Sequence, residues 1–128
     1  MQGFLLDTHT LLWMQDDSKS LSLVARRILS NPNSKLHVSI ATFWEIVIKS
    51  SIGKIELHYT IDDLHLACMT NDITVLPIEI STLSQLKSLP GIHKDPFDRI
   101  IISTAIDHDL QVITLDPEIK KYDLDCIW

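Results

Sequence analysis

Short apolar runs alternate along the chain with longer segments whose apolar residues recur at helical spacing. The short runs are typical of buried β-strands, and most are separated by one or two helix-like segments. This alternation favours an α/β fold, in which helices cover a mostly parallel sheet. The expected strands are Gly3–Leu6, Leu36–Ser39, Thr74–Leu76, Gln111–Thr114 and Cys126–Trp128.

The longer segments predict five helices, and local residues mark several of their ends. A turn over residues 31–33 closes the first helix, and Gly53 ends the second. Thr60 suits the start of the third helix as an N-cap. Asp95 is expected to cap the last helix, with Pro96 at its first position. The expected helices are Leu21–Leu29, Ile40–Ser51, Thr60–Thr70, Ser81–Ser88 and Pro96–His108.

Composition supports a folded protein made of one domain, residues 1–128. The chain is 45% hydrophobic and 22% charged, values typical of globular proteins. No apolar run approaches the roughly 20 residues of a membrane helix, and the start does not resemble a signal peptide. We therefore expect a cytoplasmic protein with no membrane partner. Cys68 and Cys126 lack a pairing pattern, which favours reduced thiols, and the six histidines lack the spacing of zinc ligands.

Two aspartates stand just after apolar strands. Asp7 comes after the first expected strand, and Asp116 follows the fourth. If the strands are parallel, both carboxylates emerge at one edge of the sheet, where ligands of such folds bind. Capping of the next turn or helix is the alternative role for each.

Glu45 is the one acid inside the apolar segment ATFWEIVIK. A helix that is apolar on all sides is buried, so its carboxylate is expected to face a cleft or a partner. A surface ion pair with Lys49, four residues later, is the alternative.

Asp98 stands at the start of the last expected helix, on the same face as Ile101, Ile102 and Ala105. This face is expected to point inward, and a buried carboxylate is costly unless it is paired or bound to metal. A favourable interaction with the helix dipole is compatible with either role. Asp95, three residues earlier, is expected mainly to cap the helix.

Acids that converge in this way predict a divalent cation. Each close pair of carboxylates repels by roughly 4 kcal/mol at an effective dielectric near 20, so a cation is needed to neutralise them. Oxygen ligands suit Mg²⁺ or Mn²⁺, whose chemistry serves phosphodiester hydrolysis. The net charge of −6 argues against a nucleic-acid partner, although acids of such a site would supply part of it.

Four motifs carry a resemblance to a known family: LLDTHTLLW, TFWEIVIKSSIGK, HKDPFDRIIISTA and VITLD. In this order they are similar to PIN-domain proteins, specifically VapC-like toxins of bacterial toxin–antitoxin pairs. The resemblance runs from Gly3 to about Tyr122, and the segment DPFDR after a histidine is its most specific part.

The resemblance implies a three-layer α/β/α sandwich around a mostly parallel sheet. It implies an Mg²⁺- or Mn²⁺-dependent endoribonuclease that cleaves RNA, forms a homodimer and is inhibited by a cognate antitoxin. The residues that it places in the acidic metal site are Asp7, Glu45, Asp98 and Asp116. The supporting residues that it indicates are Thr114, near the metal, and Asp95 and Arg99, within DPFDR.

The surfaces for RNA and antitoxin are less defined by the sequence. Trp13, Phe43 and Trp44 are candidates to line an apolar groove for the antitoxin, although large aromatics at helical spacing are more often core residues. A scattered set of cations is more often a solvated surface than a phosphate-binding one. The cationic candidates for phosphate contacts are Arg26, Arg27, Lys35, Lys49, Lys54 and Arg99.

Three other functions compete with this interpretation. Phosphotransferases of the haloacid-dehalogenase type need the pattern D-x-D after the first strand, whereas the chain has Asp7-Thr8-His9. Receiver domains need an adjacent acidic pair there, which Asp7 lacks. A PIN-like module that binds RNA or protein without cleavage remains an alternative, and the four acids argue against it.

Overall fold

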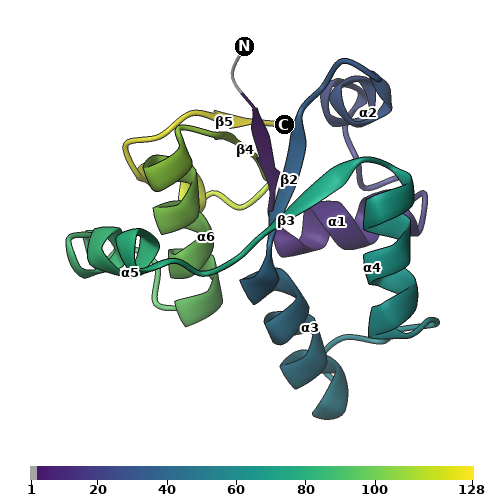
Figure 1. The fold of residues 1–128 in the computed structure, drawn as a ribbon, viewed down its shortest axis with the longest axis horizontal. Helices are drawn as coiled ribbons and strands as arrows, with labels where there is room; N and C mark the ends of the chain where they lie inside the picture. Colours follow the sequence, from purple (N-terminus) through teal and green to yellow (C-terminus); the bar gives the residue numbers. More distant parts are fainter. Residues whose placement is uncertain (1–2) are drawn as a thin grey trace.

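A single five-stranded sheet organises the molecule, which is a computed structural model that describes residues 3–128 (Figure 1). The strand order is β3-β2-β1-β4-β5, and every neighbouring pair is parallel. The ends of the strands differ from the expected ones by one residue or none. The strands are β1 (Phe4–Leu6), β2 (Leu36–Ser39), β3 (Ile73–Leu76), β4 (Gln111–Ile113) and β5 (Cys126–Ile127).

The five expected helices are all present. Two of them, α3 and α6, have the expected bounds, and the other three differ by one or two residues. The helices are α1 (Thr8–Gln15), α2 (Leu23–Ser30), α3 (Ile40–Ser51), α4 (Ile61–Thr70), α5 (Ile80–Lys87) and α6 (Pro96–His108), with a 3₁₀ turn η1 (Ile119–Lys121). Asp95 caps α6, and Thr60 caps α4 through a capping box with Asp63.

Helix α1 was not expected from the sequence. Its segment THTLLWMQ has no clear apolar stripe at helical spacing, and its β-branched threonines have low helix propensity. The side chain of Asp7 caps the helix by accepting a hydrogen bond from the backbone N–H of Thr10. Tertiary packing stabilises the rest, because Leu11 and Leu12 are buried in the core.

The sheet separates two layers of helices, which confirms the expected α/β/α sandwich. In Figure 1, α5 and α6 cover one face of the sheet, while α1, α2 and α4 cover the other. Successive residues of a strand point to opposite faces. Leu5 therefore packs with Ile101 and Ile102 of α6, whereas Leu6 packs with Leu11 of α1.

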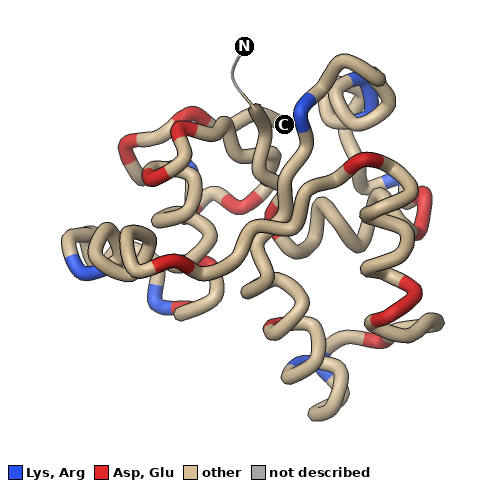
Figure 2. The backbone as a smooth tube through the Cα atoms, in the orientation of Figure 1, with Lys and Arg blue, Asp and Glu red and all other residues tan. Residues whose placement is uncertain are grey.

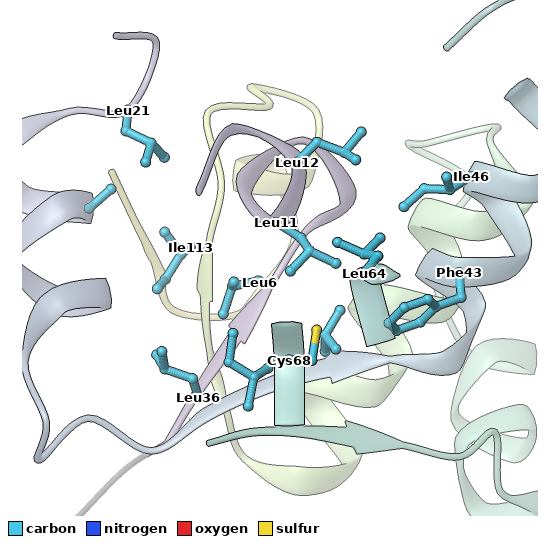
Figure 3. Packing of buried hydrophobic residues seen from close by; sticks show 13 residues of the cluster. Leu6, Leu11, Leu12, Leu21, Leu36, Phe43, Ile46, Leu64, Cys68 and Ile113 are labelled. Carbon is cyan, nitrogen blue, oxygen red and sulfur yellow. The ribbon is translucent and has the colours of Figure 1, made fainter. Parts of the chain in front are cut away.

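The larger core lies between the sheet and the layer of α1, α2 and α4, and α3 also contributes side chains to it (Figure 3). Phe43 and Ile46 of α3 point into this core. The opposite side of α3 is exposed: Trp44 keeps 53% of its surface accessible, and Ile48 keeps 42%. The expectation that α3 is buried on all sides is therefore wrong, since an apolar sequence does not specify which sides are covered.

The order of the strands places a crevice beside β1. The chain moves outward from β1 to β2 and β3, then crosses back to β4 on the other side of β1. At such a reversal the chain leaves β1 and β4 in opposite directions. The carboxyl ends of these two strands, called the central strands below, therefore border a crevice that suits ligands. Asp7 follows β1 and Asp116 lies close behind β4, so both belong to this edge.

Two further expectations concern thiols and membranes. Cys68 and Cys126 are both free, as expected, and Cys68 is buried. Within residues 3–128 no helix combines the length and the apolar character needed to cross a bilayer.

Candidate active site

The four acids that the motifs singled out lie around one cavity of about 350 Å³. They come from four places in the chain: the ends of β1 and β4, the middle of α3 and the first turn of α6. Thr8, Trp13 and Lys49 are among the other residues that line the cavity. The acids that line it are Asp7, Glu45, Asp98 and Asp116.

The Asp7 carboxylate is fixed by hydrogen bonds on both oxygens. Its Oδ1 accepts from the backbone N–H of Thr10 at 2.8 Å and lies 2.7 Å from the Thr10 hydroxyl. Its Oδ2 accepts from the Thr114 hydroxyl. Burial raises the pKa of Asp7, and the hydrogen bonds from Thr114 and Thr10 offset part of this increase. An ionised carboxylate has about four acceptor positions, so Asp7 keeps capacity for a further contact on Oδ2.

Thr114 links the two aspartates that follow the central strands. Its hydroxyl donates to Asp7 and accepts from the backbone N–H of Asp116 at 3.0 Å. The Asp116 Oδ1 atom in turn accepts from the backbone N–H of Glu118 at 2.9 Å. A fully buried hydroxyl thus orients one carboxylate directly and positions the backbone of the other.

Glu45 combines both roles that were weighed for it. Its side chain forms the i,i+4 ion pair with Lys49, yet it is only 2% exposed and lines the cavity. The Thr8 hydroxyl donates to its other oxygen. Lys49 also reaches Asp95, with Nζ 3.3 Å from Oδ2. Partial burial alone lowers the pKa of Lys49, but the hydrogen bond and charge of Glu45 raise it overall.

Asp98 lies in the first turn of α6, on the face of the helix that points inward. The residues that form this face below it are Ile101, Ile102 and Ala105, all buried. Burial, followed by the charges of Asp95 and Glu45, raises the pKa of Asp98 to about 7. Asp95 differs: partial burial alone raises its pKa, but the backbone N–H of Asp98 and the Lys49 ammonium lower it overall.

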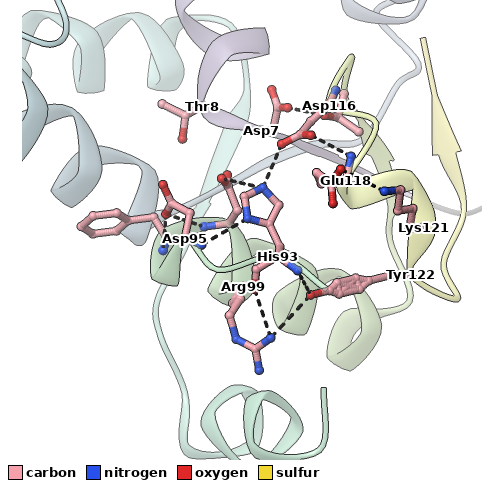
Figure 4. Close-up of polar contacts among 12 residues, drawn as sticks. Asp7, Thr8, His93, Asp95, Arg99, Asp116, Glu118, Lys121 and Tyr122 are labelled. Carbon is pink, nitrogen blue, oxygen red and sulfur yellow. Dashed lines mark hydrogen bonds and ion pairs between the residues drawn. The ribbon is translucent and has the colours of Figure 1, made fainter. Parts of the chain in front are cut away.

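His93 completes the cluster, and the sequence interpretation missed it. Its Nε2 atom lies 3.1 Å from Oδ2 of Asp98 and 3.0 Å from Oδ2 of Asp116 (Figure 4). Ligand atoms of these three residues all lie within 4.8 Å of one another, a spacing that suits a metal ion. Its only sequence signal was its position before DPFDR, because spacing rules for histidine ligands do not cover a His-Asp-Asp set.

Comparison with known families agrees with this geometry. The model of the PIN domain family matches residues 4–124. The chain belongs to the PIN domain family. The match includes all four acids that line the cavity.

Individual relatives of this PIN domain agree with the VapC-like resemblance. The chain is 26% identical over 125 residues to Ribonuclease VapC22 from Mycobacterium tuberculosis, covering 95% of this chain and 93% of that protein. The structure of VapBC2 from Rickettsia felis bound to a promoter DNA fragment matches with a TM-score of 0.70 at 15% identity, covering 98% of each chain. A toxin–antitoxin complex from Klebsiella pneumoniae matches with a TM-score of 0.66 at 20% identity, covering 98% and 97%. At such identities the structures show a shared fold.

The supporting residues of this PIN domain have distinct places. Thr114 and Asp95 contact the acidic cluster, as described above. The guanidinium of Arg99 is directed instead toward backbone oxygens, including that of Pro90 at 2.8 Å and that of Leu89 at 3.4 Å. These contacts hold the loop before α6 in place. Because they occupy the Arg99 guanidinium, its placement does not support the idea that it contacts phosphates.

The remaining candidates are spread over the molecule. Figure 2 shows Lys and Arg positions on several separate segments rather than along one stripe. Among them Lys49 lines the cavity, whereas Arg26 is paired with Asp17. Of the aromatic residues, Phe43 belongs to the core and Trp44 is exposed, with its ring against that of Phe97.

The donor set of this PIN domain fits a hard divalent cation. Carboxylate oxygens from Asp7, Asp98 and Asp116 face one cavity, and such ligands are preferred by Mg²⁺ and Mn²⁺. The raised pKa values of Asp7 and Asp98 show that the protein disfavours their negative charges in the absence of a counterion. A cation in the cavity would relieve this unfavourable charge.

Proposed function

We propose that this PIN domain is an Mg²⁺- or Mn²⁺-dependent endoribonuclease. The observation that carries the proposal is the convergence of four acids on one cavity at the carboxyl ends of the central strands. Membership of the PIN family and the similarity to a protein named Ribonuclease VapC22 support RNA as the substrate.

Asp7, Asp98 and Asp116 would hold the cation, with Glu45 on the α3 side of the cavity. A bound Mg²⁺ or Mn²⁺ lowers the pKa of a coordinated water and stabilises negative charge on a phosphate. Thr114 and Thr10 hold the Asp7 carboxylate in one orientation. Lys49 compensates the charge of Glu45 and lines the same cavity as the four acids.

The direct test is incubation of total bacterial RNA with the purified protein, followed by mapping of new 5′ ends. The reactions would contain Mg²⁺, Mn²⁺ or EDTA, and the Asp98→Asn variant would control for contaminating nucleases. Discrete cuts that need both the cation and Asp98 are expected. Binding of RNA without any cuts, across RNA from several sources, would favour a PIN-like binding module instead.

We also propose that the chain is the toxin of a toxin–antitoxin pair and acts as a homodimer. The solved structures that share its fold include VapBC complexes, which supports a protein antitoxin as its partner. Expression of the wild-type chain alone should arrest growth, whereas Asp98→Asn should not. Light scattering should give twice the mass of one chain. A cytoplasmic location stays a prediction.

A further inference from the structure

His93 lies between two acids that come from different elements. Asp98 belongs to α6, whereas Asp116 follows β4, and the imidazole Nε2 atom contacts both. The side chain is only 14% exposed. An imidazole in this place has two possible roles: it is a metal ligand through an unprotonated Nε2, or it is a donor to Asp116 beside Asp98.

The other ring nitrogen distinguishes these roles. The backbone N–H of Asp95 points at Nδ1 of His93 over 3.2 Å (Figure 4). A backbone N–H can only donate, so Nδ1 accepts and carries no proton. The ring proton is therefore on Nε2, the atom that faces Asp98 and Asp116. A histidine that binds metal has the opposite arrangement, because its second nitrogen donates to a carbonyl, a carboxylate or water.

The backbone around His93 is held from two sides. Its N–H donates to the Tyr122 hydroxyl at 2.7 Å, and that hydroxyl donates to the carbonyl of Pro90 at 3.0 Å. Arg99 donates to the same Pro90 carbonyl at 2.8 Å. Tyr122 is buried, so the loop is anchored both to α6 and to the segment after η1. These hydrogen bonds fix the backbone of His93 and so limit where its imidazole can lie.

We propose that His93 is a positioning residue whose Nε2–H donates to Asp116 and faces Oδ2 of Asp98 at 3.1 Å, so that it sets the spacing of the two carboxylates for cation binding without binding the cation itself. The proposal rests on the proposed metal site. Asp116 accepts this bond with one of about four acceptor positions, and Asp98 only lies beside the N–H, so both keep oxygen lone pairs for a cation. The positive end of the N–H would also reduce the repulsion between the two carboxylates before the cation arrives.

The test compares three proteins loaded with Mn²⁺: the wild type, His93→Gln and His93→Ala. The Gln side chain places an amide N–H close to the position of Nε2, so it restores the donor, whereas Ala removes it. Titration calorimetry gives the Mn²⁺ affinity, and pulsed EPR detects any ¹⁴N nucleus bound directly to Mn²⁺. His58→Ala, at an exposed histidine outside the cavity, is the matched control.

The expected wild-type EPR spectrum shows no directly bound nitrogen. His93→Ala should weaken Mn²⁺ binding by roughly 10- to 100-fold, as for other residues that orient metal ligands, and His93→Gln should recover most of the affinity. His58→Ala should bind as the wild type does. If His93→Ala fails to fold, the wild-type EPR spectrum and the Mn²⁺ affinity of His93→Gln still test the proposal.

Three results would overturn the proposal. A nitrogen signal in the wild type that disappears in His93→Gln would make His93 a metal ligand. Unchanged Mn²⁺ affinity in folded His93→Ala would remove its positioning role. Affinity in His93→Gln as low as in His93→Ala would show that the Nε2–H donor does not carry this role, which would overturn the proposal as stated. In each case the proposed metal-dependent function would stand. A wild-type protein that binds neither Mn²⁺ nor Mg²⁺ would overturn that function and the role of His93 with it.

Discussion

The hydroxyl of Thr114 donates a hydrogen bond to the carboxylate of Asp7, although the two residues are 107 positions apart. The bond crosses between the ends of β1 and β4, the two strands that border the crevice. This bond makes the position of the Asp7 carboxylate depend on the pairing of β1 with β4. The acidic site therefore depends on the same strand register that builds the sheet.

Replacement of this hydroxyl tests the connection. Thr114→Val keeps the shape of the side chain but leaves Asp7 without its Oδ2 donor. We expect the free energy of unfolding to fall by about 1–3 kcal/mol, the usual cost of an unsatisfied buried polar group. Mn²⁺ binding should also weaken, since Asp7 loses its orientation. Thr114→Ser, which keeps the hydroxyl, should be much closer to the wild type in urea unfolding and in calorimetry.

Asp98→Asn distinguishes the effect of the Asp98 charge on stability from its role in cation binding and cleavage. The pKa of about 7 shows that the fold opposes the negative charge of Asp98. Without metal at about pH 8, the neutral amide should raise the free energy of unfolding by at least about 1 kcal/mol, since one pKa unit corresponds to about 1.4 kcal/mol. Cleavage and Mn²⁺ stabilisation should be lost. A large loss of stability in the metal-free variant would instead show a structural requirement for the carboxylate.

The raised pKa of Asp98 also predicts how stability depends on pH. The ordinary value is 3.8 and the folded value is about 7, so between these pH values the folded protein holds a proton that the unfolded chain has released. The metal-free protein should therefore become less stable as pH rises from about 4 to about 7. Urea unfolding over this range measures the effect. Asp98→Asn should show a shallower decrease.

Metal binding should have the opposite dependence. A cation that binds Asp98 must displace its proton, so Mn²⁺ affinity should rise by up to about tenfold per pH unit below about pH 7. Burial raises the pKa of Asp7 as well, which acts in the same direction. Calorimetry from about pH 6 to about pH 8 checks this, and an affinity that stays constant over the range would contradict it.

Lys49→Met tests the ion pair beside the cavity. The substitution leaves the buried carboxylate of Glu45 without its counterion. We expect a loss of roughly 3 kcal/mol in the metal-free protein, as for other broken buried pairs. Lys49→Arg keeps the charge and should lose less. The double variant Lys49→Met with Glu45→Gln should recover much of the stability, and no recovery would place the cost elsewhere.

Much of the fold could be predicted because local signals agreed with the tertiary structure. The segment from Asp95 to His108 combines an N-cap, a proline at the first turn and one apolar face, and its bounds were predicted without error. Thr60 marked the start of α4 in the same way. Helix α1 lacks such a face, so its existence depends on packing that one sequence does not display.

The site was predictable in its acids but not in its contacts. Parallel strands place Asp7 and Asp116 at one edge, and this inference needed only the strand positions. The role of His93 depends on a loop whose path is set by hydrogen bonds to Tyr122 and Arg99. No rule on the spacing of residues in the sequence predicts these contacts. The exposed face of α3 was missed for a related reason, since burial depends on what the rest of the chain covers.

Strand β1 lies at the centre of the sheet although it begins at residue 4. During synthesis β1 leaves the ribosome before its two neighbours, and the second of these, β4, begins only at Gln111. One edge of β1 thus stays open, with unpaired backbone groups, until β4 has been made. Asp116 reaches Asp7 only when that edge closes. A nascent chain therefore completes its acid set only after the residues between Asp7 and Asp116 have been made, so that translation itself delays the onset of any nuclease activity.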